Sequence, residues 1–311
     1  MARHDIIVVG GSAGGIEAAC AILRELPANL PAAVFVVQHV GSDSALADVL
    51  QRCGAVKVAT ASDGETVRPG RVYVAPSDKH LMLQDGKVRI SRGPRENRHR
   101  PSVDILFRTA ARAYRSRVIA VVLSGTLDDG AAGVFAVQQR RGIVVVQDPD
   151  SALFPSMPRN ALRAARADYC VPLAEIGPLL VKLVREGKVM GKSKGKTAPR
   201  KLKTRRDLGA ASFVCPECSG PLFPAEGAPS GQLACLVGHS FGPESLSEAH
   251  REAVERALLT TMRLLQERAG LQEHLAKYGH NGHRKQHFKE CAEAAAADVA
   301  LLREVDRKSV V

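Results

Sequence analysis

Three polar side chains in the first half of the chain follow apolar runs of strand length. Ser12 lies in the glycine-rich turn after the first run, His39 ends the second, and Asp128 and Asp129 follow a later one. In a parallel α/β sheet the carboxyl ends of the strands share one edge, where ligands bind. A serine, an imidazole and a carboxylate that meet there supply a nucleophile, a general base and the acid that orients the base. The sequence therefore predicts a Ser-His-Asp site.

The turn that holds Ser12 differs from a dinucleotide-binding turn. Its three key positions are Gly10, Ser12 and Gly15, so the middle glycine, which lets a pyrophosphate approach, is replaced. The next strand ends in Gln38 and His39 and not in the acid that holds a ribose. Both differences favour a nucleophile over a phosphate contact, and the free N–H groups of the turn suit an oxyanion.

The rest of this half alternates apolar strands with helical spacing. Asp85-Gly86 between two alternating runs predicts an antiparallel hairpin over 80–90, and Ser102 or Asp104 is expected to cap the next helix. We expect an α/β fold with a doubly wound, mostly parallel sheet and an antiparallel hairpin excursion, joined to a small zinc-binding and helical C-terminal module.

The composition of the chain limits the other classes of function. The chain has 311 residues and a formal charge of +12, but residues 185–206 hold ten Lys or Arg and one Glu, so most of the excess lies in one segment. Glycines and a proline there indicate a basic flexible linker over 186–210, and no specific nucleic-acid binding is expected.

The sequence contains no apolar run of 18 residues and no signal-peptide pattern, so no membrane insertion and a cytoplasmic location are expected. The seven cysteines are accordingly interpreted as thiols or metal ligands, with Cys20, Cys53 and Cys170 as core residues.

Several separated motifs resemble the catalytic domain of the chemotaxis protein-glutamate methylesterases (CheB type), from about residue 5 to 185. They are VGGSAGG at 9–15, VVQH at 36–39, VAP at 74–76, HRPSVD at 99–104, LSGTLDDGAAG at 123–133 and MP at 157–158. The resemblance implies that Ser12 is the nucleophile, His39 the general base and Asp129 the orienting acid, with no cofactor for catalysis. Asp128 is then the less suitable acid and is expected to be solvated.

The implied reaction is hydrolysis of glutamate methyl esters on methyl-accepting receptor proteins, with deamidation of glutamine as the same attack. Ala13 stands where the family usually has Thr, and 126–128 stand where it has Met-Gly-Ala. Backbone N–H groups survive such changes, so Ala13 and Thr126 remain candidates for oxyanion or substrate contacts. The other candidates are Arg98, His99, Arg100 and Met157. The chain begins at the catalytic strand, so control by the family's N-terminal receiver domain is not expected.

A second module is predicted beyond the linker. Cys215, Cys218, Cys235 and His239 form a C-x₂-C … C-x₃-H set, which fits a closed tetrahedral zinc site of structural type. Unligated thiols in a loop are the alternative. The expected domains are 1–185 for catalysis, 186–210 for the linker, 211–242 for the zinc module and 243–311 for a helical region.

The helical region carries an apolar stripe typical of a packing or dimer surface. It consists of Leu258, Met262 and Leu265 and is continued by Leu271 and Leu275. Two further functions therefore stay open beside the hydrolase. One is a non-catalytic signalling scaffold that binds partners through the C-terminal module, and the other, ranked last, is a nucleotide-binding regulator.

Overall fold

The computed structural model describes residues 4–41, 45–186, 213–225, 227–229, 231–278 and 282–309. The chain folds into two compact units, unit 1 over Met1–Leu246 and unit 2 over Ser247–Val311. The predicted basic linker falls outside the described residues apart from Glu186.

Unit 1 is built on a seven-stranded parallel sheet in the order β3-β4-β2-β1-β7-β8-β9. The central strands are apolar, rich in valine and isoleucine, and buried on both faces, as expected for a parallel sheet covered by helices. The strands are β1 (Ile6–Gly11), β2 (Ala33–Gln38), β3 (Lys57–Thr60), β4 (Arg71–Val74), β7 (Val118–Val122), β8 (Ile143–Gln147) and β9 (Tyr169–Val171). This confirms the predicted α/β fold.

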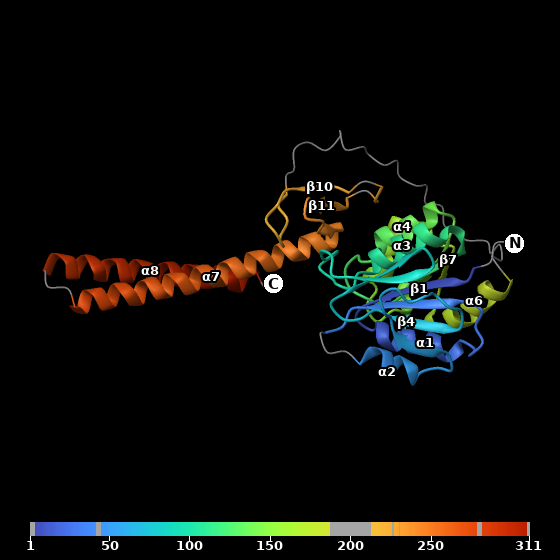
Figure 1. The fold of residues 1–311 in the computed structure, drawn as a ribbon. Helices are drawn as coiled ribbons and strands as arrows, with labels where there is room; N and C mark the ends of the chain where they lie inside the picture. Colours follow the sequence, from blue (N-terminus) through green and yellow to red (C-terminus); the bar gives the residue numbers. More distant parts are fainter. Residues whose placement is uncertain are drawn as a thin grey trace. The chain divides into compact units, whose positions relative to one another are not determined.

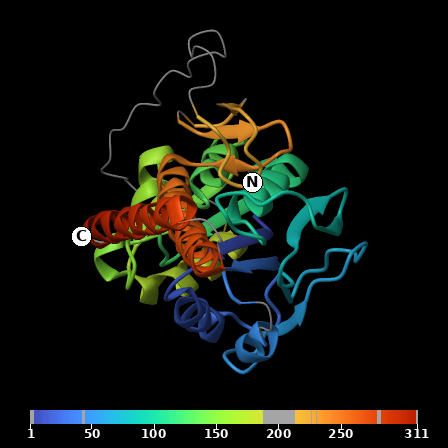
Figure 2. The same cartoon turned by 90° about the vertical axis from the view of Figure 1, so that its left-hand side faces the viewer.

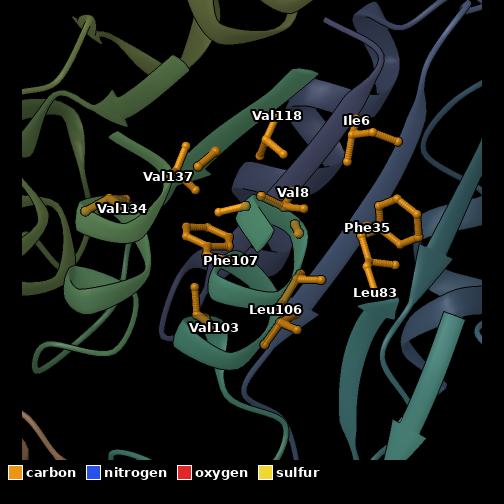
Figure 3. Packing of buried hydrophobic residues seen from close by; sticks show 14 of the residues in the cluster. Ile6, Val8, Phe35, Leu83, Val103, Leu106, Phe107, Val118, Val134 and Val137 are labelled. Carbon is orange, nitrogen blue, oxygen red and sulfur yellow. The ribbon is translucent and has the colours of Figure 1, made fainter. Parts of the chain in front are cut away.

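Helices cover both faces of the sheet (Figure 1). One face packs against α1 (Gly15–Glu25), α2 (Leu46–Gln51) and α6 (Leu173–Glu186). The other packs against α3 (Val103–Tyr114), α4 (Ala131–Gln139) and α5 (Ser156–Ala164). Figure 3 shows this second layer, where Leu106 and Phe107 of α3 lie among Val8, Phe35 and Val118 of the sheet. Short 3₁₀ helices lie at Arg115–Arg117 and Pro149–Ser151.

The predicted antiparallel excursion is β5 (His80–Gln84) paired with β6 (Lys87–Ser91), visible in teal in Figure 2. Asp85 and Gly86 have φ angles of 51° and 78°, the left-handed conformation that this tight turn requires. The hairpin is tied to α3, because the Leu83 N–H donates to Thr109 Oγ1 at 3.2 Å.

The chain reverses its direction across the sheet at β1. It runs from β1 to β2 on one side and later returns to β7 on the other side. In open α/β sheets such a switch point opens a crevice at the carboxyl ends of the strands. The turn after β1 closes on the turn after β7, where the Ser12 N–H donates to the Ser124 carbonyl at 3.0 Å.

A small antiparallel sheet completes unit 1. It consists of β10 (Leu222–Pro224), β11 (Leu233–Cys235) and β12 (Ser240–Phe241). We call residues 213–246 the Cys/His module. Helix α7 (Pro243–Tyr278) begins in this module and continues into unit 2.

In unit 2, α7 and α8 (Gly282–Ser309) lie side by side in both views (Figures 1 and 2). Leu258, Met262 and Leu265 of the predicted stripe are half-buried, and Ala295 and Val299 of α8 are buried. The first part of the stripe therefore packs within this helical hairpin, whereas Leu271 and Leu275, which continue it, are exposed. Leu259 and Leu264 of α7, outside the stripe, are also more than half exposed.

The cysteine prediction needs two corrections. Cys20 and Cys53 are not thiols but form a disulfide, which their Cα separation of 5.1 Å permits. Cys170 is exposed rather than buried, because it lies on the edge strand β9. Among the described residues, no helix is long and apolar enough to span a bilayer.

Candidate functional site

Ser12 and His39 are neighbours because of strand register. β1 and β2 pair in parallel up to Gly11 and Gln38, and the chain continues from these residues to Ser12 and His39. The His39 N–H still donates to the Gly11 carbonyl at 3.2 Å, so the pairing extends one step further. Adjacent strands lie about 4.8 Å apart, so the backbones of the serine and the histidine emerge together at the sheet edge.

Asp129 meets the same histidine from the other side. His39 Nε2 lies 2.9 Å from Asp129 Oδ2, and both side chains are buried. This hydrogen bond assigns the ring proton to Nε2, which leaves Nδ1 as the basic nitrogen. Nδ1 is buried and has no hydrogen-bond partner among the described residues. An imidazole with one nitrogen held by a carboxylate and the other unoccupied is prepared to take a proton.

The Asp129 carboxylate accepts further hydrogen bonds besides the one from His39. Oδ1 accepts from Asn97 Nδ2 at 3.0 Å, from Ser102 Oγ at 2.9 Å and from the Asp104 N–H at 3.1 Å. Oδ2 also accepts the Val103 N–H at 2.8 Å. Two of these donors are backbone N–H groups in the first turn of α3, where the helix dipole favours a negative charge. The carboxylate is thus held rigidly.

These contacts decide which of two buried acids is charged. Burial raises the pKa of the Asp129 carboxyl, but the hydrogen bond and charge of His39 outweigh it and hold the pKa below its usual value. Burial and the charge of Asp129 raise the pKa of Asp104 well above its usual value. Asp129 is therefore the charged member of the pair.

His99 forms one wall of the site. Its ring stacks on that of His39, with the centroids 3.6 Å apart and the planes 11° apart. Burial, followed by the charge of His39, lowers the pKa of His99 to about 3, so the ring is neutral near pH 7. Of the other two candidates in this loop, Arg100 is paired with Asp78 at 2.8 Å, and Arg98 has a left-handed φ of 70°. The segment is a structured wall and not a freely exposed basic loop.

The turn around Ser12 presents backbone donors. Gly14 adopts a φ of 72° and precedes α1, and among the described residues the N–H groups of Ala13 and Gly14 have no acceptor. The Ala13 carbonyl is turned the other way, accepting Ser124 Oγ at 2.8 Å. The Gln38 carboxamide donates to the Ser12 carbonyl and braces the turn from β2. Free N–H groups next to a serine hydroxyl suit an oxyanion.

Of the remaining two candidates, Met157 is buried and Thr126 is exposed. Met157 is 1% exposed and packs against Gly125, where an added Cβ would lie 2.1 Å from the Met157 sulfur and 2.9 Å from Ser12 Cβ. Thr126 is exposed at the rim. Met157 thus supports the turns that hold Ser12 from below, and Thr126 is the one of the two that a substrate can reach.

Two sequence expectations are wrong here. Asp128 is not solvated but 5% exposed, and it accepts the Glu244 and Ser245 N–H groups at the start of α7, together with the Ser245 hydroxyl. Ser102 is the N-cap residue of α3, but its side chain makes no capping hydrogen bond, because its hydroxyl donates to Asp129. In both cases the partner lies far away along the chain.

The four predicted metal ligands come together. Cys215 Sγ lies 3.7 Å from His239 Nδ1, Cys218 Sγ 3.6 Å from Cys235 Sγ, and all four ligand atoms lie within 4.8 Å of one another. A tetrahedral zinc site with bonds of about 2.0–2.3 Å has ligand-to-ligand distances of about 3.5–3.8 Å. A turn places Cys235 opposite His239, since the Gly238 N–H donates to the Cys235 carbonyl. This cluster can hold a metal ion.

Sequence reasoning missed Asn97, which is completely buried and bonded to both Asp104 and Asp129. No local pattern marks an asparagine in a basic loop as part of a site. Its only signal is its place two residues before the His99 motif.

Comparison with known proteins agrees with this geometry. The family model described as CheB methylesterase matches residues 7–180, just over half of the chain. Proteins named protein-glutamate methylesterase/protein-glutamine glutaminase from Chromohalobacter salexigens and Thermotoga maritima are each 39% identical, over 188 and 185 residues. The matches cover 58% of this chain and 53% and 54% of those proteins.

Two further matched proteins are hardly longer than the region that matches this chain. A relative from Leptospira interrogans is 39% identical over 184 residues, and the match covers 58% of this chain and 95% of that protein. The crystal structure of the Thermotoga maritima CheB methylesterase catalytic domain is similar with a TM-score of 0.56 and 38% identity. That match covers 58% of this chain and 98% of the solved domain.

Proposed function

Because this chain belongs to the CheB methylesterase family, we propose that it is a serine hydrolase that cleaves glutamate methyl esters on methyl-accepting receptor proteins. Ser12 is the nucleophile, His39 the general base and Asp129 the orienting acid. The observation that carries the proposal is the His39–Asp129 pair, which leaves His39 Nδ1 without a partner among the described residues, one strand away from Ser12.

The geometry supports the following steps. Ser12 Oγ attacks the ester carbonyl while His39 Nδ1 takes its proton, and the Asp129 carboxylate stabilises the imidazolium that forms. The proton then passes to the leaving methoxide, methanol departs, and an acyl-enzyme remains. Water activated by the same nitrogen attacks this acyl group and releases the glutamate and the free serine. With a glutamine side chain the leaving group is ammonia, so deamidation uses the same residues.

The N–H groups of Ala13 and Gly14 support an oxyanion site for the tetrahedral intermediate. Neutral His99 and exposed Thr126 are the proposed substrate contacts on the rim. Arg98 and Arg100 stay further candidates for contacts with an acidic receptor helix, although the Arg100 guanidinium is already paired with Asp78.

For the second half of the chain we propose that Cys215, Cys218, Cys235 and His239 bind zinc. With all four ligands from the protein the ion has a structural role, and catalysis needs no cofactor. The proposed domains remain 1–185, 186–210, 211–242 and 243–311. Dimerisation through the C-terminal helices would use the exposed leucines of α7, since the first part of the predicted stripe packs within the helical hairpin. Specific nucleic-acid binding and membrane insertion are not part of the proposal.

A cytoplasmic location stays a prediction. The cysteines no longer support it because Cys20 and Cys53 form a disulfide, but the proposed substrate is the cytoplasmic part of a receptor.

The test is methanol release from methylated chemoreceptor cytoplasmic fragments. Ser12→Ala is expected to lower turnover by up to about a millionfold, to background, whereas the exposed Ser62→Ala leaves it unchanged. Turnover by Ser12→Ala equal to that of the wild type would refute the proposed nucleophile. If the zinc-loaded wild type released no methanol and only deletion of 210–311 had a phenotype, the scaffold function would be favoured.

A further inference from the structure

The Cys/His module contacts the loop that carries the site's buried asparagine. The Asn97 N–H donates to the Ser240 carbonyl at 2.7 Å, and the Gly242 N–H donates to Asn97 Oδ1 at 2.8 Å. Glu96 and Ser240 also form a parallel β-bridge. Asn97 is fully buried, so this is an interior contact between segments far apart in the chain.

The same side chain reaches the proposed catalytic acid. Asn97 Nδ2 donates to Asp129 Oδ1 at 3.0 Å and to Asp104 Oδ2 at 2.8 Å. One amide group therefore uses its oxygen on the module and its nitrogen on the carboxylate that holds His39. A charge-assisted hydrogen bond of this kind is stronger than a neutral one.

The proposed metal site lies directly beside this contact in the chain. His239 is followed by Ser240, which begins β12 and accepts the Asn97 N–H. β12 has only two residues and pairs with β11, which ends at the ligand Cys235. A sheet this small buries little apolar surface of its own, so a metal ion held by the four ligands would add to its stability.

A second contact fixes the module next to Asp129. Asp128 caps the first turn of α7 through Glu244 and Ser245. Gly242 fits closely against it, because an added Cβ would lie 2.2 Å from Asp128 Oδ2. The end of the module thus holds Asp128 directly, through Glu244 and Ser245, and holds Asp129 through Asn97.

We propose that the Cys/His module is part of the catalytic machinery, with Asn97 as the positioning residue that connects it to Asp129. Metal binding orders β12, β12 holds Asn97, and Asn97 holds the carboxylate in line with His39. This inference rests on the proposed triad and adds to it a segment that lies beyond the family match, which ends at residue 180. It makes activity of the full chain depend on occupancy of the metal site.

The test combines two single variants and their double variant in the full-length protein. Cys218→Ser is expected to lose zinc, and Asn97→Ala to keep it. Each is expected to lower kcat by about 10- to 100-fold, the effect of one charged hydrogen bond, with KM changed by less than about threefold. The double variant is expected to be no slower than Asn97→Ala, because both changes break the same connection. Cys291→Ser, which removes a cysteine outside the cluster, is the matched control.

A second measurement does not depend on turnover. The proton shared by His39 Nε2 and Asp129 gives a low-field proton NMR signal, which chelation of the metal or Asn97→Ala is expected to shift or broaden. Gly242→Ala leaves all four ligands intact and is expected to act in the same way, while Gly270→Ala, where a Cβ meets nothing within 4 Å, leaves the signal unchanged.

Zinc-free Cys218→Ser with the kcat and the NMR signal of the wild type would overturn the inference. If the wild type hydrolysed no ester yet its signal depended on metal, the connection would stand and the proposed function would fail. Should Cys218→Ser not fold, chelation of the metal from the wild type decides, and an NMR signal and kcat that chelation leaves unchanged would overturn the inference.

Discussion

Asp129 and Asp104 lie at the N-termini of two helices, α4 and α3, and each accepts hydrogen bonds from the first turn of the other's helix. Asp129, which precedes α4, accepts the N–H groups of Val103 and Asp104 in α3 at 2.8 and 3.1 Å. Asp104, in the first turn of α3, accepts the Gly133 N–H of α4 at 2.6 Å. Two helix N-termini thus point at two neighbouring acids. Only one of these buried acids can be charged, and the hydrogen bond to His39 makes it Asp129.

Asp129→Asn tests this assignment. The amide keeps the shape of the carboxylate but removes its charge and favours the wrong His39 tautomer, so kcat is expected to fall by about 10⁴-fold. The measurement is methanol release with saturating substrate. Asp85→Asn, in the exposed hairpin turn with a φ that asparagine also adopts, is the control and is expected to keep wild-type turnover. A drop of the same size in both variants would contradict the assignment.

Gly125→Ala tests how tightly the turns of β1 and β7 are packed. The new Cβ would overlap the Met157 sulfur and approach Ser12 Cβ, so Ser12 must move. A shift of about 1 Å at a reacting group costs on the order of 100-fold in rate, and kcat is expected to fall accordingly.

Gly270→Ala is the matched control for this change, because its Cβ meets open space in α7. The measurement is kcat together with thermal unfolding. Wild-type kcat in Gly125→Ala would show that Met157 yields and that the packing does not position Ser12.

The sheet, the hairpin and the turn that holds Ser12 could be predicted because their signals are local. Continuous apolar runs predict the strands of the sheet, Asp85-Gly86 predicts a tight turn, and Ser12 and His39 follow strands directly. Parallel topology alone then brings strand ends together at one edge. This is why the positions of Ser12 and His39 needed no knowledge of side-chain packing.

The surroundings of the site could not be predicted, since they depend on pairings across long stretches of chain. Asn97 bonds Asp129 at a separation of 32 residues and Gly242 at 145, and Asp128 caps a helix that begins more than a hundred residues later. The Cys20–Cys53 bond spans 33 residues and was obscured by the apolar neighbours of both cysteines. Residue type and spacing carry no signal for such partners.

The disulfide leads to a prediction about stability. Closing a loop of this length is expected to stabilise unit 1 by about 3–4 kcal/mol, mainly by restricting the unfolded chain. Cys53→Ser is expected to lower the urea midpoint of unfolding, and reductant to lower that of the wild type but not that of the variant. Exposed Cys170→Ser is the control and should leave the midpoint unchanged. A wild type that is insensitive to reductant would refute a stabilising bond.

His99 gives a stability change with pH whose sign follows from burial. Its pKa is lowered to about 3 in the folded protein, against about 6.5 in the unfolded chain, so between these values only the unfolded chain binds the proton. Stability from this group is complete above pH 6.5 and is lost as the pH falls, by about 2 kcal/mol at pH 5. Between pH 7 and pH 5 the free energy of unfolding of His99→Gln is therefore expected to fall by about 2 kcal/mol less than that of the wild type.

The measurement is the free energy of unfolding in urea at both pH values. His80, whose pKa burial also lowers, is present in both proteins, so the difference between them isolates His99. Exposed His287→Gln is the control and should follow the wild type. Equal losses in His99→Gln and the wild type would mean that His99 takes up its proton in the folded site. The ring stacked on His39 would then be charged, and a charged neighbour would oppose the imidazolium that the proposed reaction must form.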